Sequence, residues 1–172
     1  MKKVYVLLTG LLVLLVLALS ACSAQESKDP NVLLNVKEFN LISSKKLLQK
    51  MGEPEKVENW EYQKSESETL PMTTYTFQNN RFEFILYDDK VQRISIYADS
   101  YDDFTAPGFS FNEKDDILRA LGIDPATVPE SSRIDTGQAL RYESIGKIRY
   151  IWVPSYEGNS YDEIKISFSD LL

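Results

Sequence analysis

The chain has 172 residues and a formal net charge of −7, and it contains one cysteine and no histidine. An acidic chain without a basic patch is a poor partner for nucleic acid, because that binding relies on Lys and Arg to neutralise phosphates. The lack of histidine removes the usual general base, a common zinc ligand and every Ser-His or Cys-His pair. The composition therefore predicts a protein that is not an enzyme and uses no cofactor and no metal.

The first residues have the pattern of a signal peptide. Lys2 and Lys3 precede an apolar run, Val4–Leu19, that is interrupted by Thr9 and Gly10 and ends in small residues. A retained transmembrane helix needs about 20 apolar residues, so this shorter run predicts a cleaved signal peptide over residues 1–21.

The single cysteine directly follows this segment. Leu19-Ser20-Ala21-Cys22 resembles the lipobox of bacterial lipoproteins, and the alternative is an ordinary secretory signal with an incidental cysteine. The resemblance implies that Cys22 carries a diacylglycerol, that it becomes the first mature residue, and that the protein is lipid-anchored outside the cytoplasm. Cleavage there removes two lysines and no acidic residue, so the net charge becomes −9. Residues 22–40 are expected to be a tether and a lead-in segment.

Two later segments share a helical pattern. "SSKKLLQKMGEPEKV" from Ser43 and "NEKDDILRALGIDPATV" from Asn112 each place a capping residue before paired aliphatic residues, followed by Gly and then Pro. A cap, helical spacing and a Gly-then-Pro ending are the start and stop signals of a short helix.

Alternating strands follow each predicted helix. Inward positions are expected in two sets, first Phe82, Phe84, Leu86, Ile94 and Ile96, and then Leu140, Tyr142, Ile148, Tyr150, Trp152, Ile164, Ile166 and Phe168. The pairs Asn79-Asn80 and Asp88-Asp89, and later Gly146 and Gly158-Asn159, provide the turns, since these residue types tolerate positive φ.

This repetition predicts an α+β fold of two tandem modules, residues 41–103 and residues 104–172. Each module would be a helix packed on one face of an antiparallel meander of three or four strands, with the other face open. The alternative is self-similarity by chance.

The "MGEP" helix end followed by a meander resembles lipoproteins of the BamE/SmpA type, and the tandem arrangement resembles the β-lactamase inhibitor protein fold. The resemblance implies a module that binds other proteins, and this chain departs from the inhibitor pattern because it cannot form the disulfides of each module.

The open sheet face is the predicted binding surface. If Phe82, Phe84 and Leu86 face the helix, their neighbours Ile85 and Tyr87 face outward, with Arg93 and Tyr97 beside them. The second module is expected to expose Arg141, Arg149, Ile151 and Val153 in the same way. Tyr, Arg and β-branched residues suit an interface, although plain strand propensity also explains them. The partner-binding candidates are Ile85, Tyr87, Arg93, Tyr97, Arg149 and Ile151.

Two other functions remain open. Trp60 and the aromatic residues of the connector 97–111 could bind a small ligand or a cell-wall carbohydrate, although packing explains the connector aromatics more simply. A hydrolase would need paired carboxylates that converge in a pocket. The connector's aspartates do not have the spacing of a calcium loop. We therefore expect a non-catalytic lipoprotein, held to the membrane through Cys22, that binds an envelope or extracellular protein.

Overall fold

A computed structural model describes residues 32–103 and 105–172. The predicted signal peptide, Cys22 and the tether as far as residue 31 lie outside the described residues, as does Phe104. The described residues form one compact unit. Among the described residues no helix is long and apolar enough to cross a membrane.

Short helical elements and longer strands make up this unit. The helical elements are η1 (Val36–Phe39), α2 (Ser44–Met51), η2 (Asp99–Tyr101), α3 (Asp116–Ala120), η3 (Pro125–Thr127) and η4 (Glu130–Ser132). The strands of the first half are β1 (Lys56–Ser65), β2 (Glu68–Phe77), β3 (Phe82–Tyr87), β4 (Lys90–Tyr97) and β5 (Phe109–Ser110). The strands of the second half are β6 (Arg133–Asp135), β7 (Leu140–Ile145), β8 (Ile148–Val153), β9 (Tyr156–Glu157), β10 (Ser160–Tyr161) and β11 (Glu163–Ser167).

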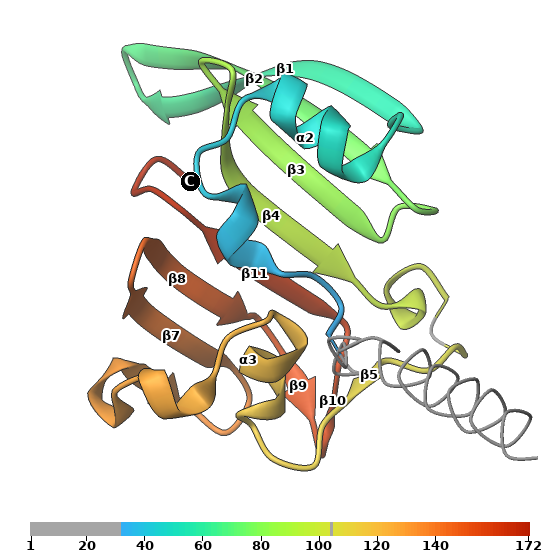
Figure 1. The fold of residues 1–172 in the computed structure, drawn as a ribbon, viewed down its shortest axis with the longest axis vertical. Helices are drawn as coiled ribbons and strands as arrows, with labels where there is room; N and C mark the ends of the chain where they lie inside the picture. The colour runs from blue at the N-terminus through green and yellow to red at the C-terminus, as the bar shows by residue number, and fades with distance from the viewer. Residues whose placement is uncertain (1–31, 104) are drawn as a thin grey trace, which may run out of the picture. The chain divides into compact units, whose positions relative to one another are not determined.

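Most strands belong to one antiparallel sheet. Its eight strands run in the order β1-β2-β3-β4-β11-β8-β7-β6, and a separate three-stranded sheet has the order β5-β10-β9 (Figure 1). Strand β11 lies in the middle of the large sheet, where Ile164 pairs with Ile96 and Ile166 pairs with Ile94 of β4. Both halves of the chain therefore share one sheet.

The predicted fold of two tandem α+β modules, each with its own sheet, is wrong. The strands of residues 41–103 and of residues 104–172 join edge to edge through β4 and β11. The second predicted helix is reduced to the five residues of α3, and its first-turn Asp116 instead accepts from the backbone N–H groups of Asn112 and Glu113. Alternation along a strand shows which face a side chain takes, but it does not show which strand lies beside it.

The predicted ends of the first helix are confirmed. The Ser43 side chain caps α2 by accepting a hydrogen bond from the backbone N–H of Lys46. Gly52, with φ of +85°, ends the helix, and its backbone N–H donates to the backbone oxygen of Leu48. Only a residue without a Cβ adopts that φ at no steric cost. The apolar side of α2 then places Leu47 in the core, where it is fully buried.

The predicted turns are also confirmed. Asn79 and Asn80 have positive φ between β2 and β3, and so do Asp88 and Asp89 between β3 and β4. Backbones with positive φ give hairpin turns whose twist matches that of the strands, and Asn and Asp tolerate this conformation. Polar dipeptides in these two places therefore fix the register of three neighbouring strands.

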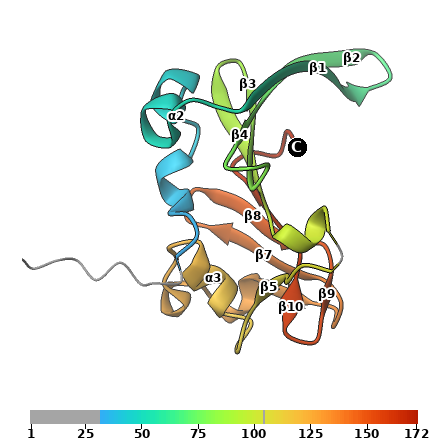
Figure 2. The same ribbon diagram turned by 90° about the vertical axis from the view of Figure 1, so that its right-hand side faces the viewer.

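One core fills the space between the large sheet and the helical elements. It includes Val36 and Phe39 of η1, Leu47 of α2 and Ile117 of α3, which pack on inward side chains from both halves of the sheet. The two orthogonal views show η1, α2 and α3 on the same side of the sheet (Figures 1 and 2). The opposite side, which we call the open face, carries none of these three helices, but the short element η2 lies on it at the end of β4, where Tyr101 packs on Tyr97.

Candidate functional site: the open face of the large sheet

The strand register defines the side chains of the open face. Opposite residues in an antiparallel pair point to the same side, so a chain of such pairs makes a row across the sheet. The first row takes one residue from each strand: Lys56, Thr76, Glu83, Ser95, Lys165, Trp152, Arg141 and Ile134. The second row takes Glu58, Thr74, Ile85, Arg93, Ser167, Tyr150 and Glu143. Tyr97 and Glu163 begin a third row.

Cations lie over the aromatic rings of this face. Lys165 Nζ lies 5.4 Å from the centre of the Trp152 ring, and the Arg141 guanidinium carbon lies 4.7 Å from the centre of the Tyr150 ring. Cation–π contacts of this kind contribute about 0.5–1 kcal/mol at exposed sites. They hold large aromatic side chains in place at the surface, which lowers the entropy lost when a partner covers them.

Ion pairs fix the same two cations. Lys165 Nζ lies 3.1 Å from Glu163 Oε1, and Arg141 Nε lies 3.0 Å from Glu143 Oε1. The first two rows together hold four cations and three carboxylates, whereas the whole chain has a net charge of −7. This nearly neutral surface attracts neither a polyanion nor a polycation, and it suits the mixed charge of a protein surface.

Burial changes the proton affinity of groups in the middle of the face. Burial raises the pKa of the Glu83 carboxyl above its ordinary value, while Arg93 opposes this rise. Burial also raises the pKa of the Tyr97 hydroxyl, so Tyr97 is a neutral hydrogen-bonding group at physiological pH. The Nε atom of Arg93 is buried and has no hydrogen-bond partner among the described residues. Proteins rarely leave such a group unpaired, and functional surfaces are one place where they do.

A small apolar cluster lies at the β1–β2 end of the open face. Strand β3 pairs with Thr73–Phe77 of β2, so the start of β2 and the facing part of β1 extend past the end of β3. We call six side chains there the apolar end: Trp60, Tyr62, Leu70, Met72, Ile85 and Tyr87. They are separate from the main core, and Leu171 and Leu172 pack against them.

Four of the six partner-binding candidates lie on or beside the open face as the sequence predicts. Ile85, Tyr87, Arg93 and Tyr97 all do so, although Ile85 is only 2 % exposed because it is packed within the apolar end. Arg149 lies farther along β8, where it forms an ion pair with Asp170. Arg141, expected outward but not chosen as a candidate, lies in the first row.

The predicted outward position of Ile151 is wrong, as is that of Val153. Both side chains are fully buried in the main core, while Trp152, predicted to point inward, is 39 % exposed. Ile148 faces the core as predicted. Between Ile148 and Tyr150, however, the side chains of β8 stop alternating between the two faces of the sheet. Ser144, on the facing part of β7, has a φ of +59° at this point. A break of one residue turns every later side chain to the other face.

Trp152, Tyr150 and Lys165 belong to the face but were not predicted there. A usable signal was present in β11, because Ile164 and Ile166 face the core and therefore place Lys165 outward. No comparable signal shows that β8 lies beside β11, which is what brings Trp152 to Lys165.

Tyr97 and Tyr101 of the connector line a small hollow of about 280 Å³ on the open face, whereas the other described aromatic residues of the connector and Trp60 are packed. Phe109 and Phe111 pack on Tyr161, with ring centres 5.3 and 5.8 Å apart, and Tyr101 packs on Tyr97 at 4.4 Å. Trp60 donates from Nε1 to Thr74 Oγ1 at 2.9 Å and lies within the apolar end. Packing thus accounts for the described aromatic residues of this group.

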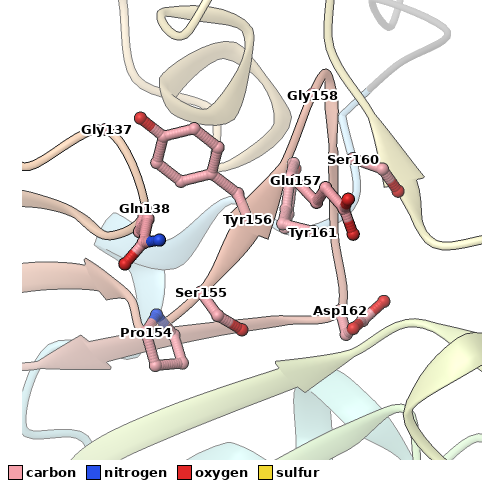
Figure 3. Close-up of a pocket in the computed structure, with 10 residues that line it drawn as sticks. All are labelled: Gly137, Gln138, Pro154, Ser155, Tyr156, Glu157, Gly158, Ser160, Tyr161 and Asp162. Carbon is pink, nitrogen blue, oxygen red and sulfur yellow. The ribbon is translucent and has the colours of Figure 1, made fainter.

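A polar hollow of about 870 Å³ lies apart from the rows of the open face, between the β6–β7 loop and the β9–β10 hairpin (Figure 3). Tyr156, Gln138, Ser155, Glu157, Ser160 and Asp162 contribute polar groups to its lining. The Tyr156 hydroxyl is 2.6 Å from Lys114 Nζ and donates to Asp135 Oδ1 at 2.8 Å, so its ring is firmly held. Lys114 also lowers the pKa of Asp135 to about 2.

Within residues 32–103 and 105–172, no group of three or more His, Cys, Asp and Glu side chains is placed to hold a metal ion. Lys114, Asp135 and Tyr156 satisfy one another by hydrogen bonds, which is the arrangement of a structural link between α3, β6 and β9.

Comparisons of the chain with protein-family models, with curated proteins and with solved structures found no match.

Proposed function

We propose that this chain is a membrane-anchored extracytoplasmic lipoprotein that binds another protein through its open face and does not act as an enzyme. The observation that carries the binding proposal is the pairing of Trp152 with Lys165 and of Tyr150 with Arg141 on the sheet face that η1, α2 and α3 leave uncovered. Trp, Tyr and Arg are the residue types that dominate binding energy at protein interfaces.

The size of the face supports a folded partner. Neighbouring strands lie about 4.8 Å apart, so eight strands span about 34 Å. With about 20 Å along the strands, the face offers on the order of 700 Å², close to the roughly 800 Å² per partner of a standard interface. The nearly neutral charge of the rows favours a partner surface that mixes cations and anions over a nucleic acid or a charged membrane.

The proposed anchor comes from the sequence alone. The apolar run before Leu19-Ser20-Ala21-Cys22 supports export and acylation of Cys22. Two acyl chains give stable membrane attachment, because burial contributes about 0.8 kcal/mol per methylene group. The partner would then be an envelope or extracellular protein within reach of the membrane surface.

Crosslinking on intact cells followed by affinity purification tests the binding proposal. We expect a discrete protein to copurify with the unaltered chain and to be lost from the double variant Tyr97→Ala/Trp152→Ala. Leu48→Ala is the matched control, because Leu48 is an exposed apolar residue on the helix side of the sheet. Equal recovery from all three chains, or recovery of bulk envelope material only, would disprove binding through this face.

The polar hollow favours a second candidate function, a lipoprotein that binds a small polar ligand or a cell-wall carbohydrate. A firmly held aromatic ring with amide, hydroxyl and carboxylate groups around it suits a ligand rich in hydroxyl groups. Titration with cell-wall oligosaccharides, followed by NMR, would show shifts around Tyr156 that Tyr156→Ala abolishes. No shift at millimolar glycan excludes this candidate.

A further inference from the structure

The end of the described chain lies on the open face. After β11, Phe168 returns to the main core, and the next residues cross to the apolar end, where Leu171 and Leu172 contact its aromatic and aliphatic side chains. Figure 2 shows this end of the chain on the side of the sheet away from α2. The segment 169–172 therefore occupies part of the surface proposed above for partner binding.

Few polar contacts hold this segment. The Tyr150 hydroxyl donates to the backbone oxygen of Leu172, and Ser167 Oγ lies 3.1 Å from the same oxygen. Asp170 forms an ion pair with Arg149, but these side chains are 78 % and 49 % exposed, so solvent and salt weaken the pair. Leu171 and Leu172 are only partly buried. A segment attached in this way can leave without unfolding the sheet.

The apolar end holds its form through contacts within β1, β2 and β3. Trp60 is fixed by its hydrogen bond to Thr74 and by an edge-on contact with the Tyr62 ring at 6.3 Å. Leu70 and Met72 lie opposite these two aromatic residues in the β1–β2 register. None of these contacts uses the segment 169–172, so departure of the two leucines would leave a formed apolar groove.

We propose that the apolar end is a docking groove for an extended segment of the partner that carries two adjacent bulky aliphatic side chains, and that residues 169–172 are its intramolecular competitor. The inference rests on the proposed protein-binding function and names the chemistry of one part of the partner. The seated Leu171-Leu172 pair is the observation that identifies this ligand class. A tethered segment acts at a millimolar effective concentration, so it excludes weak ligands and yields to a partner that also covers Trp152 and Tyr150.

The test needs no knowledge of the natural partner. The probe is a fluorescein-labelled peptide with the sequence of residues 166–172, and its binding is measured by fluorescence anisotropy. The acceptor is the full chain with Leu171→Ser and Leu172→Ser, which empties the groove of its own leucines. We expect this variant to bind the peptide at least tenfold more tightly than the unaltered chain does.

Two controls define the site of binding. A peptide with both leucines replaced by serine should not bind, and adding Met72→Ala to the acceptor should weaken binding of the original peptide at least fivefold. A second acceptor that lacks residues 169–172 repeats the measurement if the serine variant does not fold. Failure of both acceptors to fold would show that the two leucines are an essential part of the core, and this would overturn the proposal. Equal binding of the peptide to the altered and unaltered chains would also overturn it.

The peptide measurement and the crosslinking measurement fail separately. If the peptide does not bind but Trp152→Ala still removes the copurified protein, the docking groove is wrong and the proposed function stands. If the peptide binds in the expected way but no protein copurifies from cells, the proposed function is wrong while the groove remains a peptide-binding site.

Discussion

Trp152 and Lys165 lie directly opposite each other on β8 and β11, with the lysine nitrogen 5.4 Å from the centre of the indole ring. This contact joins two strands in the middle of the large sheet and presents a tryptophan to solvent on the open face. Large exposed aromatic side chains that are already held in place are typical centres of protein interfaces.

Trp152→Ala is expected to weaken partner binding at least tenfold while changing the free energy of unfolding by less than about 1 kcal/mol, because an exposed side chain contributes little to the core. Urea denaturation measures the stability, and quantitative crosslinking measures the binding. Val57→Ala is a suitable control, since Val57 is exposed on another part of the sheet. A large loss of stability in Trp152→Ala would show that the ring is structural.

Ile151→Ala is expected to have the opposite effect. Its side chain is fully buried in the main core, so truncation leaves a cavity and should lower the free energy of unfolding by about 2–5 kcal/mol. Thermal and urea denaturation would detect the loss. A stability close to that of the unaltered chain would contradict the assignment of the two faces of β8.

Glu83→Gln is expected to stabilise the chain at neutral pH. Burial raises the pKa of this carboxyl in the folded state, so the folded chain binds a proton more tightly than the unfolded chain does. The ionised carboxylate therefore costs stability above its folded pKa, and the cost disappears as the pH falls below the unfolded value of about 4.3. Urea denaturation between pH 8 and pH 4 should show that the extra free energy of unfolding of Glu83→Gln over the unaltered chain becomes smaller as the pH falls. Glu58→Gln serves as a comparison on the same face. A constant difference across this range would exclude the pH linkage.

Cys22→Ser is expected to abolish acylation. Without the thiol no diacylglycerol can be attached, so labelled fatty acid should not enter the protein and the membrane fraction should lose it. Metabolic labelling and detergent partitioning measure the two effects. Unchanged membrane association in the serine variant would show that attachment uses something other than Cys22.

Local features of the fold were predictable because they depend on neighbouring residues. Ser43 and Gly52 fix the ends of α2, and Asn79-Asn80 and Asp88-Asp89 mark tight turns. Alternation placed Phe82, Phe84 and Leu86 in the core correctly. Each of these signals lies within a few residues of the feature that it specifies.

Features that depend on distant residues were not predictable in the same way. The pairing of β4 with β11 joins the two predicted modules into one sheet, and nothing in either strand's alternation specifies its partner. The inward position of Ile151 depends on the break in alternation between Ile148 and Tyr150, opposite Ser144, and neither β7 nor β8 contains a glycine or proline that would mark it. On β8, Ile151 and Val153 were therefore assigned to the face in place of Tyr150 and Trp152.

The central place of β11 also has a consequence for how the chain matures. Strand β11 is the last strand of the described chain, yet it separates β4 from β8 in the sheet. During synthesis or export, β4 must therefore wait with one edge unpaired until residues 163–167 emerge, and such long-range pairing is slow and exposed to aggregation. A nascent polypeptide of this kind benefits from a chaperone that shields β4 until its final neighbour arrives.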